Sequence, residues 1–515
     1  MLAKCFSGAV NGVDARTVEI EVYSSLGTSQ FAIVGLPDTA VKEAKDRIPT
    51  ALKNQRLASH KEYDVMVNLA PADVKKEGPI YDLPIAVGLL KATGRIRNEH
   101  LDDYALVGEL ALSGEVRRVR GVIPMAIEMK RIGCRAIIVP AENAEEASVV
   151  SGIDVIAVRT LQEAVQYLNG ERTIEPSRTD LAELVLRERD DDDDFADVKG
   201  QESTKKAVEV AVAGGHNLLM IGTPGSGKTM LARRIPSILP PLTVEEALEV
   251  SRIHSVAGVE KGGGTFVTRR PFRAPHHTTS NIGLLGGGTH PVPGEVSLAH
   301  RGVLFLDEFA EFPRQALEVL RQPLEDGHVG VSRAAAAHDF PSKFMLVAAM
   351  NPCPCGYHGD PKHACRCTTK SILKYQGRVS GPLLDRIDIQ VEVPPVDPKD
   401  LPLMEPGESS ERIRERVMAA RAIQAERYRG MKGVYTNADV KSRDLADACR
   451  FTTKDKERLV RIIERLKLSA RAYDKVLRVA RTIADLAGVD AVRDEDVNNA
   501  LGYRRMDDEE NSFWA

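Results

Sequence analysis

"LLMIGTPGSGKTML", residues 218–231, joins an apolar stretch of strand length to a glycine-rich turn and then to a helix-forming segment. This order matches both the residue pattern and the strand–loop–helix setting of a phosphate-binding loop. Glycines let backbone N–H groups turn toward a polyphosphate, and the start of the following helix adds positive potential. We expect Lys228 to contact the β- and γ-phosphates of ATP and Thr229 to bind Mg²⁺. The whole predicted loop is Gly222, Thr223, Pro224, Gly225, Ser226, Gly227, Lys228 and Thr229.

A second apolar run, "GVLFLDE" (residues 302–308), ends in two acidic residues. Asp307 is placed to hold Mg²⁺ through water, and Glu308 to act as the general base on the attacking water. An acidic pair after an apolar strand is often only the polar edge of a sheet. Beside a phosphate-binding loop, the catalytic interpretation is favoured.

A third strand, "FMLVAAMN" (residues 344–351), ends in Asn351, which is expected to orient the water or sense the γ-phosphate. Farther on, "SGPLLDRIDI" (residues 380–389) places Arg386 after a short apolar helix. Arg386 either pairs with a neighbouring aspartate or acts as an arginine finger on the ATP of a neighbouring copy, a role worth roughly 10³-fold in rate. Arg378 is a weaker competitor for that role. Arg471, in the helical tail, either touches the γ-phosphate or is solvated.

Length and composition limit the number of domains and the classes of function. A chain of 515 residues is too long for one hydrophobic core, so two to four domains are expected. The net charge of −4 argues weakly against a protein that coats nucleic acid over its whole surface. No apolar run approaches the roughly 20 residues of a membrane span, and a secretory signal is not recognisable, so we expect a cytoplasmic protein.

The chain divides into four predicted parts. Residues 1–170 alternate strands and helices, and 171–194 form an acidic linker that ends in a run of aspartates. Residues 195–400 form a second α/β block. Residues 401–515 are expected to be helical, with an apolar stripe made by Leu459, Ile462, Ile463 and Leu466.

Four of the seven cysteines lie within residues 351–367, "NPCPCGYHGDPKHACRC". Prolines keep the first part extended, so cysteines two positions apart face the same side. Four thiolates would close a tetrahedral zinc site without a position for water, which indicates a structural role. His358 or His363 could replace one thiol, and free thiols or a disulfide are the alternatives. The predicted zinc ligands are Cys353, Cys355, Cys365 and Cys367.

A set of motifs resembles one family. "FRAPHHT", "PGEVSLAHRGVLFLDE", "RQPLE", "NPCPCG" and "SGPLLDRIDI" are similar, in this order, to motifs of the YifB/ComM family of magnesium-chelatase-like AAA+ ATPases. The resemblance covers nearly the whole chain. It implies an α/β fold with an AAA+ P-loop core, a helical lid, ATP and Mg²⁺ as cofactors, and a ring of copies, usually a hexamer. By position, Arg386 matches the family's finger, and Asn351 and Arg471 its two sensors. "FADVKGQ" (residues 195–201) resembles the segment beside adenine.

The interval from Lys228 to Asp307 is long for such a core, so it holds an insert. A second insert, residues 327–344, is predicted to be a hairpin with "HVGV" and "FMLV" as its arms. In related rings, inserts at these points project toward the central channel and touch DNA. Solvation or packing on a neighbouring copy is an equal alternative, and paired metal ligation by His276 and His277 is not favoured. The candidate phosphate contacts are Arg269, Arg270, Arg273 and Arg333.

The N-terminal block, residues 1–170, resembles the proteolytic domain of Lon-type proteases. That family uses a serine after a Gly-Pro pair and a later lysine, whereas here Ile80 follows Gly78-Pro79 and no lysine lies between Gly121 and Met129. A Ser–Lys nucleophile needs both groups. We therefore expect an α+β scaffold without peptidase activity.

These observations favour an ATP-dependent DNA motor that promotes branch migration of recombination intermediates, as in natural transformation. A chelatase subunit that drives Mg²⁺ insertion into a porphyrin is one rival, although no porphyrin pocket is apparent. A protein-remodelling ATPase is the other. DNA stimulation of ATP hydrolysis would separate the three.

Overall fold

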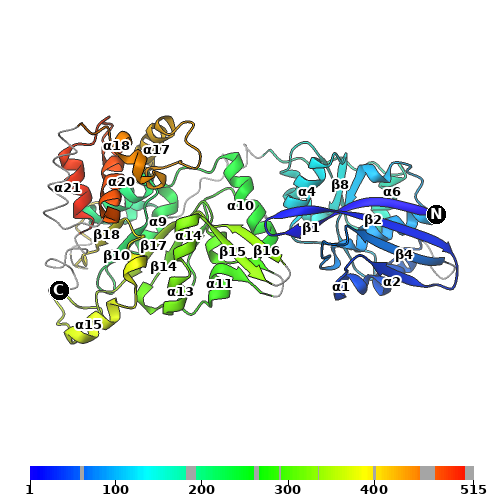
Figure 1. Ribbon diagram of the computed structural model, residues 1–515, viewed down its shortest axis with the longest axis horizontal. Helices are drawn as coiled ribbons and strands as arrows, with labels where there is room; N and C mark the ends of the chain where they lie inside the picture. The colour runs from blue at the N-terminus through cyan, green and yellow to red at the C-terminus, as the bar shows by residue number, and fades with distance from the viewer. Residues whose placement is uncertain are drawn as a thin grey trace.

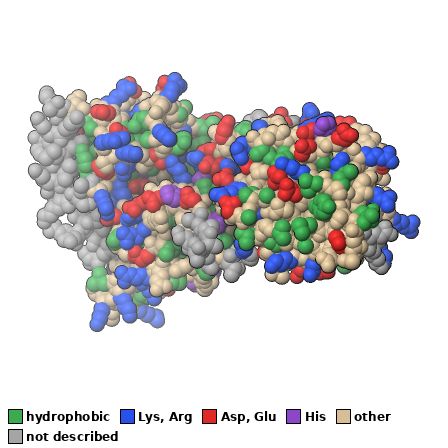
Figure 2. Space-filling model, turned by 45° about the vertical axis from the view of Figure 1, so that its right-hand side comes forward, with side chains coloured by type: hydrophobic (Ala, Val, Ile, Leu, Met, Phe, Trp, Pro, Cys, Tyr) green, Lys and Arg blue, Asp and Glu red, His purple; other side chains and the backbone are tan. Residues whose placement is uncertain are grey.

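The computed structural model describes residues 1–57, 63–180, 193–259, 266–288, 291–333, 336–397, 399, 402–452 and 470–504. Figure 1 shows two bodies side by side: an N-terminal domain, and a larger body made of an α/β core and the C-terminal helices. The predicted stripe at Leu459–Leu466 lies outside the described residues. In Figure 2, basic and acidic side chains are interspersed over the visible face and do not form one basic surface.

The N-terminal domain is built on a mixed seven-stranded sheet in the order β3-β4-β2-β1-β5-β8-β9. In β2, the side chains of Val18, Ile20 and Val22 are buried and alternate with more exposed neighbours, as expected for a sheet with one covered face. The strands are β1 (Leu2–Asn11), β2 (Asp14–Leu26), β3 (Phe31–Val34), β4 (Tyr63–Ala70), β5 (Tyr104–Leu106), β8 (Ala136–Pro140) and β9 (Asp154–Val158). A separate short pair is formed by β6 (Glu109–Leu110) and β7 (Val116–Arg117).

Six helices accompany this sheet in the described part of residues 1–180. They are α1 (Thr39–Lys42), α2 (Ala44–Asn54), α3 (Asp82–Ala92), α4 (Val122–Arg131), α5 (Ala144–Ser148) and α6 (Leu161–Leu168). Beyond α6, Ser177 still donates its N–H to Val155 O, so part of the predicted linker packs on the N-terminal domain. Ile80, where Lon-type proteases carry serine, is a partly buried side chain that packs between the two hydrophobic clusters of this domain.

The second body contains a parallel five-stranded sheet in the order β11-β14-β17-β10-β18. The strands are β10 (Leu218–Ile221), β11 (Phe272–Arg273), β14 (Val303–Leu306), β17 (Met345–Met350) and β18 (Ile389–Glu392). Every residue of β10, β14 and β17 is buried, because helices cover both faces of a parallel sheet, and this explains their uninterrupted apolar sequences. If the five strands are numbered in chain order, their spatial order in the sheet is 2-3-4-1-5.

Helices of the core and of the C-terminal part pack into one buried hydrophobic cluster. One buried cluster combines the sheet, α8 (Glu202–Gly214) and α9 (Lys228–Ile238) with helices of the C-terminal part. The other face of the sheet has its own cluster. The core also contains α11 (Asn281–Leu285), α12 (Glu295–Leu298), α13 (Arg314–Glu318), α14 (Arg321–Asp326), α15 (Thr369–Gln376) and α16 (Gly381–Leu384). The C-terminal helices are α17 (Ser410–Arg427), α18 (Ser442–Ala448), α20 (Ala470–Leu486) and α21 (Asp494–Gly502).

The predicted hairpin exists, but its second arm is different from the predicted one. Strand β15 (His328–Arg333) pairs antiparallel with β16 (Ala336–Pro341). Phe344–Val347, the expected arm, instead leads into and forms part of the central strand β17. Both segments are apolar, and only pairing with distant strands of the sheet distinguishes them.

The two bodies meet at the inserts of the core. Helix α10 (Val244–Ala257) lies between them in Figure 1. At its C-terminal end, Ser255 O accepts the N–H of Gly121 (3.1 Å), and the Ser255 hydroxyl bonds Glu146. Arg252 pairs with Asp14, the first residue of β2. In the turn between β1 and β2, a Cβ placed on Gly12 would lie 3.5 Å from Asp339 O in β16, so this turn lies next to the hairpin.

Candidate nucleotide and metal sites

The carboxyl ends of β10, β17 and β14 form one edge of the parallel sheet, and each is followed by predicted site residues. Gly222 begins the phosphate loop after β10, and a Cβ there would lie 2.4 Å from Val393 O, which excludes any side chain. Gly227, at φ +91°, ends the loop and caps α9 in a conformation that favours glycine. The strand–loop–helix setting inferred from the sequence is therefore present.

Lys228 lies inside the phosphate loop. Its ammonium donates to Gly222 O (2.7 Å) and Thr223 O (2.9 Å), and Asn351 Oδ1 lies 3.3 Å away. Burial lowers the pKa of Lys228 to about 8, although the negative charge of Asp307 acts in the opposite direction. The loop thus places a desolvated cation where a polyphosphate would supply its missing counter-charge.

Thr229 and Asp307 are in direct contact. The Thr229 hydroxyl donates to Asp307 Oδ2 at 2.7 Å. A hydroxyl and a carboxylate side by side, next to a phosphate loop, are the oxygen ligands that Mg²⁺ prefers in nucleotide sites. These two residues fit the ion, and when bound it would neutralise charge on the phosphates.

Glu308 follows Asp307 in a left-handed conformation, with φ +51°. Its N–H donates to Asp307 Oδ1 (2.9 Å), and its carboxylate Oε2 lies 2.9 Å from His277 Nδ1. A non-glycine residue with positive φ is uncommon and often marks a functional position. The partner His277 was not among the predicted site residues.

Residues 195–201, predicted to lie beside adenine, pack against the phosphate loop. Phe195 is buried, and the Gln201 side-chain amide donates to Ser226 O and to Pro394 O (3.2 Å). Gln201 has φ +58°, which turns the chain into α8 at this point. The segment thus connects the phosphate loop to the chain that leaves β18.

Arg386 is mostly buried in its own chain, with 11% of its side chain exposed, and pairs with Glu325 of α14. Neither neighbouring aspartate is its described partner: Asp388 contacts His216 and Lys475, whereas Asp385 lies 3.9 Å from Arg471. Arg378, the competitor, is about half exposed and pairs with Glu311.

Arg386 and Arg471 line one cavity of about 930 Å³ between the core and the C-terminal helices. Among the described residues that line it, none belongs to the phosphate loop. The side chain of Arg471 is 71% exposed. The structure therefore brings Lys228, Thr229, Asp307 and Asn351 together, and it places the two arginines together elsewhere.

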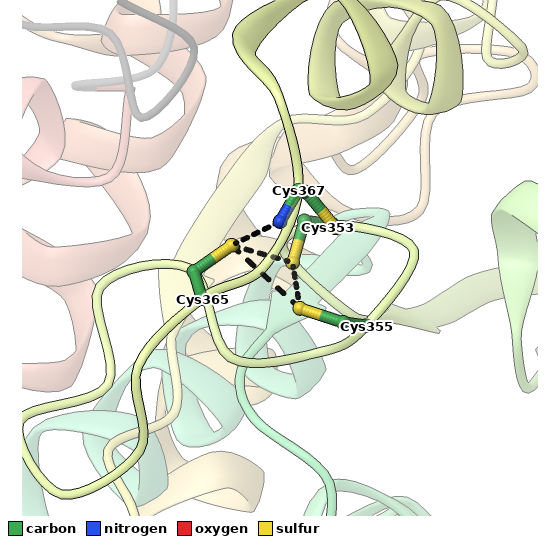
Figure 3. Close-up of side chains that lie close together, drawn as sticks. All are labelled: Cys353, Cys355, Cys365 and Cys367. Carbon is green, nitrogen blue, oxygen red and sulfur yellow. Dashed lines mark hydrogen bonds between the residues drawn. The ribbon is translucent and has the colours of Figure 1, made fainter.

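The four predicted cysteine ligands converge (Figure 3). Their sulfur atoms all lie within 4.8 Å of one another, and three Sγ–Sγ distances are 3.4, 3.6 and 3.7 Å. Thiolates around tetrahedral zinc, at about 2.3 Å from the ion, are about 3.8 Å apart, so the cluster fits this metal. The N–H groups of Tyr357 and Arg366 lower the pKa of Cys355 to about 6, despite opposition from burial. His363, the alternative ligand, has its Nδ1 3.3 Å from Asp360 Oδ1.

The cysteine loop contacts the phosphate loop. Gly356 follows Cys355 and precedes Cys365 in the chain, and its φ is +86°. A Cβ on Gly356 would come within 2.6 Å of Pro224 Cγ, closer than real Cβ contacts. The turn that carries Cys353 and Cys355 is thus packed directly against the loop that surrounds Lys228.

The predicted DNA contacts have different surroundings. The Arg270 guanidinium is engaged with Glu246 (2.7 Å), Pro240 O and Arg301 O, and Arg273 makes two bonds to Glu295 (2.6 and 2.7 Å). Arg269 is exposed at the start of the same segment. Arg333 ends β15 at the tip of the hairpin, and its side chain lies outside the described residues.

Comparison with known proteins identifies the class first. Three models of the magnesium chelatase subunit ChlI match residues 194–401, 18–143 and 407–504. Together with the sheet order and the phosphate loop, they define an AAA+ ATPase of the magnesium-chelatase type. A stretch of 108 residues, 21% of this chain and 19% of the relative, is 32% identical to Lon protease 2 of Bacillus subtilis.

Full-length relatives then give the family. The chain is 43% identical over 508 residues to the competence protein ComM of Haemophilus influenzae, and the match covers 98% of each chain. It is also 43% identical over 504 residues to YifB of Escherichia coli, covering 97% of this chain and 96% of that protein. The chain belongs to the YifB/ComM family, as its motifs predicted.

Proposed function

We propose that this chain is an Mg²⁺-dependent ATPase that moves along DNA and promotes branch migration of recombination intermediates. One observation carries the ATPase part: Lys228, Thr229, Asp307 and Asn351 meet at one sheet edge, with Glu308 adjacent. The DNA part is supported by the near-complete likeness to ComM, which is named as a competence protein. Uptake of foreign DNA in natural transformation is a setting in which such an activity is used.

In the proposed reaction, the backbone of the phosphate loop and Lys228 bind the polyphosphate, while Thr229 and Asp307 hold Mg²⁺. Glu308 accepts the proton of the attacking water, and Asn351, next to Lys228, orients that water or senses the γ-phosphate. Arg386 and Arg471 lie in a separate cavity, so we assign both to the nucleotide of a neighbouring copy. This assignment implies a ring, for which we propose a hexamer.

The DNA contacts belong to the two inserts. We propose Arg269, whose side chain is exposed, and Arg333, which ends β15, as DNA contacts; Arg270 and Arg273 bind carboxylates of their own chain. Mixed charges on the face in Figure 2 also favour a narrow contact in a channel over a broad basic surface. A narrow contact of this kind suits single strands and branched ends.

The test measures ATP hydrolysis by the full chain with forked or Holliday-junction DNA, with an unfolded protein, and with a porphyrin. We expect stimulation by DNA only, and migration of the branch in a strand-exchange assay. Lys228→Ala and Glu308→Gln should abolish turnover in every arm. Stimulation by the unfolded protein or by the porphyrin, and not by DNA, would replace this proposal with one of its rivals.

A further inference from the structure

The cavity that holds Arg386 and Arg471 lies at the amino edge of the parallel sheet, at the opposite end of the strands from the phosphate loop. Asn217, Gly302 and Phe344, which directly precede β10, β14 and β17, all line it. Among the described residues of its lining, nine are basic and seven are acidic. Positive charge is therefore in excess on the cavity wall.

Helix α20 contributes a basic face to this wall. Arg471, Lys475 and Arg478 line the cavity at spacings of four and three residues, which place side chains on one face of a helix. Arg478 Nε donates to the neutral backbone oxygen of Val440 (2.8 Å), and Lys475 lies 3.8 Å from Asp388. Arg471 is mostly exposed. The basic face of α20, defined by these three residues, thus offers cations to the cavity.

The last described residues of the chain are fixed beside this face. Arg504 Nη1 donates to Ile387 O at 3.1 Å, and the same oxygen accepts from Lys475 Nζ at 3.1 Å. One residue earlier, Tyr503 O accepts the N–H of Gln390 in β18 (2.9 Å). The chain that follows Arg504 therefore begins next to the basic face of α20.

The sequence that follows is acidic and then aromatic. Residues 505–515, "RMDDEENSFWA", lie outside the described residues and are called here the acidic segment. Four consecutive acids, residues 507–510, follow Arg504 by three to six positions. At about 3.3 Å per extended residue, they reach about 10 to 20 Å from Arg504. The basic face spans about 10 Å along the helix axis, so charge and reach both match.

We propose that the acidic segment binds in this cavity of its own chain, with residues 507–510 on the basic face of α20, and closes the cavity to a neighbouring copy. The effect on turnover rests on the proposed function, in which Arg386 and Arg471 serve the nucleotide of a neighbour. If the segment is bound about nine-tenths of the time, the apparent affinity between copies falls about tenfold, because only the open fraction can associate.

The sole tryptophan of the chain, Trp514, reports directly on this binding. The experiment compares the wild type with a neutral-segment variant of the full chain that carries Asp507→Asn, Asp508→Asn, Glu509→Gln and Glu510→Gln. At dilutions that keep the copies separate, and without nucleotide, we expect acrylamide to quench Trp514 severalfold less in the wild type. Salt at about 1 M should remove this difference, because it screens charges beyond about 3 Å. Equal quenching of the two proteins in low salt would overturn the proposal.

Arg478→Gln tests the cavity side of the contact. We expect its Trp514 quenching to rise toward that of the neutral-segment variant. Arg443→Gln is the matched control, because Arg443 is an exposed arginine of α18 that pairs with Asp444 (3.5 Å) and does not line the cavity. An equal rise in both variants, or wild-type quenching in a folded Arg478→Gln protein, would overturn the assignment to the cavity. The neutral-segment variant keeps the test decisive if Arg478→Gln unfolds, because its substitutions lie outside the packed core.

ATP hydrolysis over a range of protein concentrations separates this inference from the proposed function. The neutral-segment variant should reach half of its maximal specific activity at about a tenfold lower concentration, with the same maximum. If the specific activity of the wild type does not depend on concentration, the shared nucleotide site is rejected, and Trp514 quenching still decides whether the segment binds. If it does depend on concentration and the variant gives the same curve, only closure by the acidic segment is rejected.

Discussion

Lys228 carries an unbalanced charge in the phosphate loop. Its ammonium contacts two backbone carbonyls, a hydroxyl and an amide oxygen, all of them neutral. Burial lowers its pKa to about 8 from the usual 10.5. A polyphosphate in the loop restores an opposite charge and therefore raises this pKa again. Nucleotide binding and protonation of Lys228 are thus linked.

We expect the affinity for ATP to be constant below pH 8 and to fall above it. Below pH 8, the lysine is already charged in the free protein. Above pH 8, binding must take up a proton, and the affinity falls by up to about tenfold per pH unit. Calorimetric titration with a non-hydrolysable analogue between pH 7 and 9.5 measures both the affinity and the proton uptake. A constant affinity over this range would contradict the linkage.

Gly356 connects the cysteine loop to the phosphate loop. In Gly356→Ala, a Cβ must fit within 2.6 Å of Pro224 Cγ at a φ of +86°, so we expect the KM for ATP to rise severalfold while the metal content is kept. Gly359→Ala is the matched control, because Gly359 has φ +78° in the same loop but a Cβ there meets no atom within 4 Å. Equal effects in both variants would show backbone strain alone.

The cysteine loop, residues 353–367, lies between Asn351 and Arg386 in the chain. If it is held by zinc, protein purified without chelators should contain about one zinc ion per chain. Cys365→Ser should lose the metal and much of the turnover, while ATP still binds through the unchanged phosphate loop. Elemental analysis and nucleotide titration measure these two quantities. Cys134→Ser, at a buried cysteine outside the cluster, serves as the control, and a chain without zinc would remove the idea.

The elements of the nucleotide site were predictable from local sequence, and those of the inserts were not. Gly222–Thr229, Asp307 and Asn351 all follow apolar runs, and the carboxyl ends of parallel strands necessarily share an edge. Cys353 and Cys355 were predictable because their spacing in an extended chain has few geometric outcomes. His277 and the second arm of the hairpin depend on which distant strand pairs with which, and short apolar segments such as Phe344–Val347 satisfy more than one pairing.

In the whole molecule, the proposed nucleotide site is divided between copies. Arg386→Ala should lower turnover roughly 10³-fold, about 4 kcal/mol. ATP binding should be retained, because Arg386 lines the separate cavity and does not belong to the phosphate loop. The measurement is the steady-state ATP hydrolysis rate of the full chain. A variant that hydrolyses at the normal rate would reject Arg386 as the finger.

Mixing Arg386→Ala with Lys228→Ala tests whether each nucleotide site is shared between two copies. Arg386→Ala keeps an intact phosphate loop, and Lys228→Ala keeps an intact Arg386, so a ring containing both regains some complete sites. With random assembly at equal amounts, activity should recover to roughly a quarter of the wild-type rate. No recovery in rings shown to contain both chains would place Arg386 beside the nucleotide of its own copy.

The N-terminal domain is joined to α10 through Arg252 and Ser255, and its turn at Gly12 lies next to Asp339 of the hairpin. If the inserts move during each cycle, a mass of more than 160 residues must travel with them, or these joints must open. A load on the N-terminal domain would then oppose each movement of the inserts. Anchoring the N-terminal domain to a bead would therefore slow ATP hydrolysis.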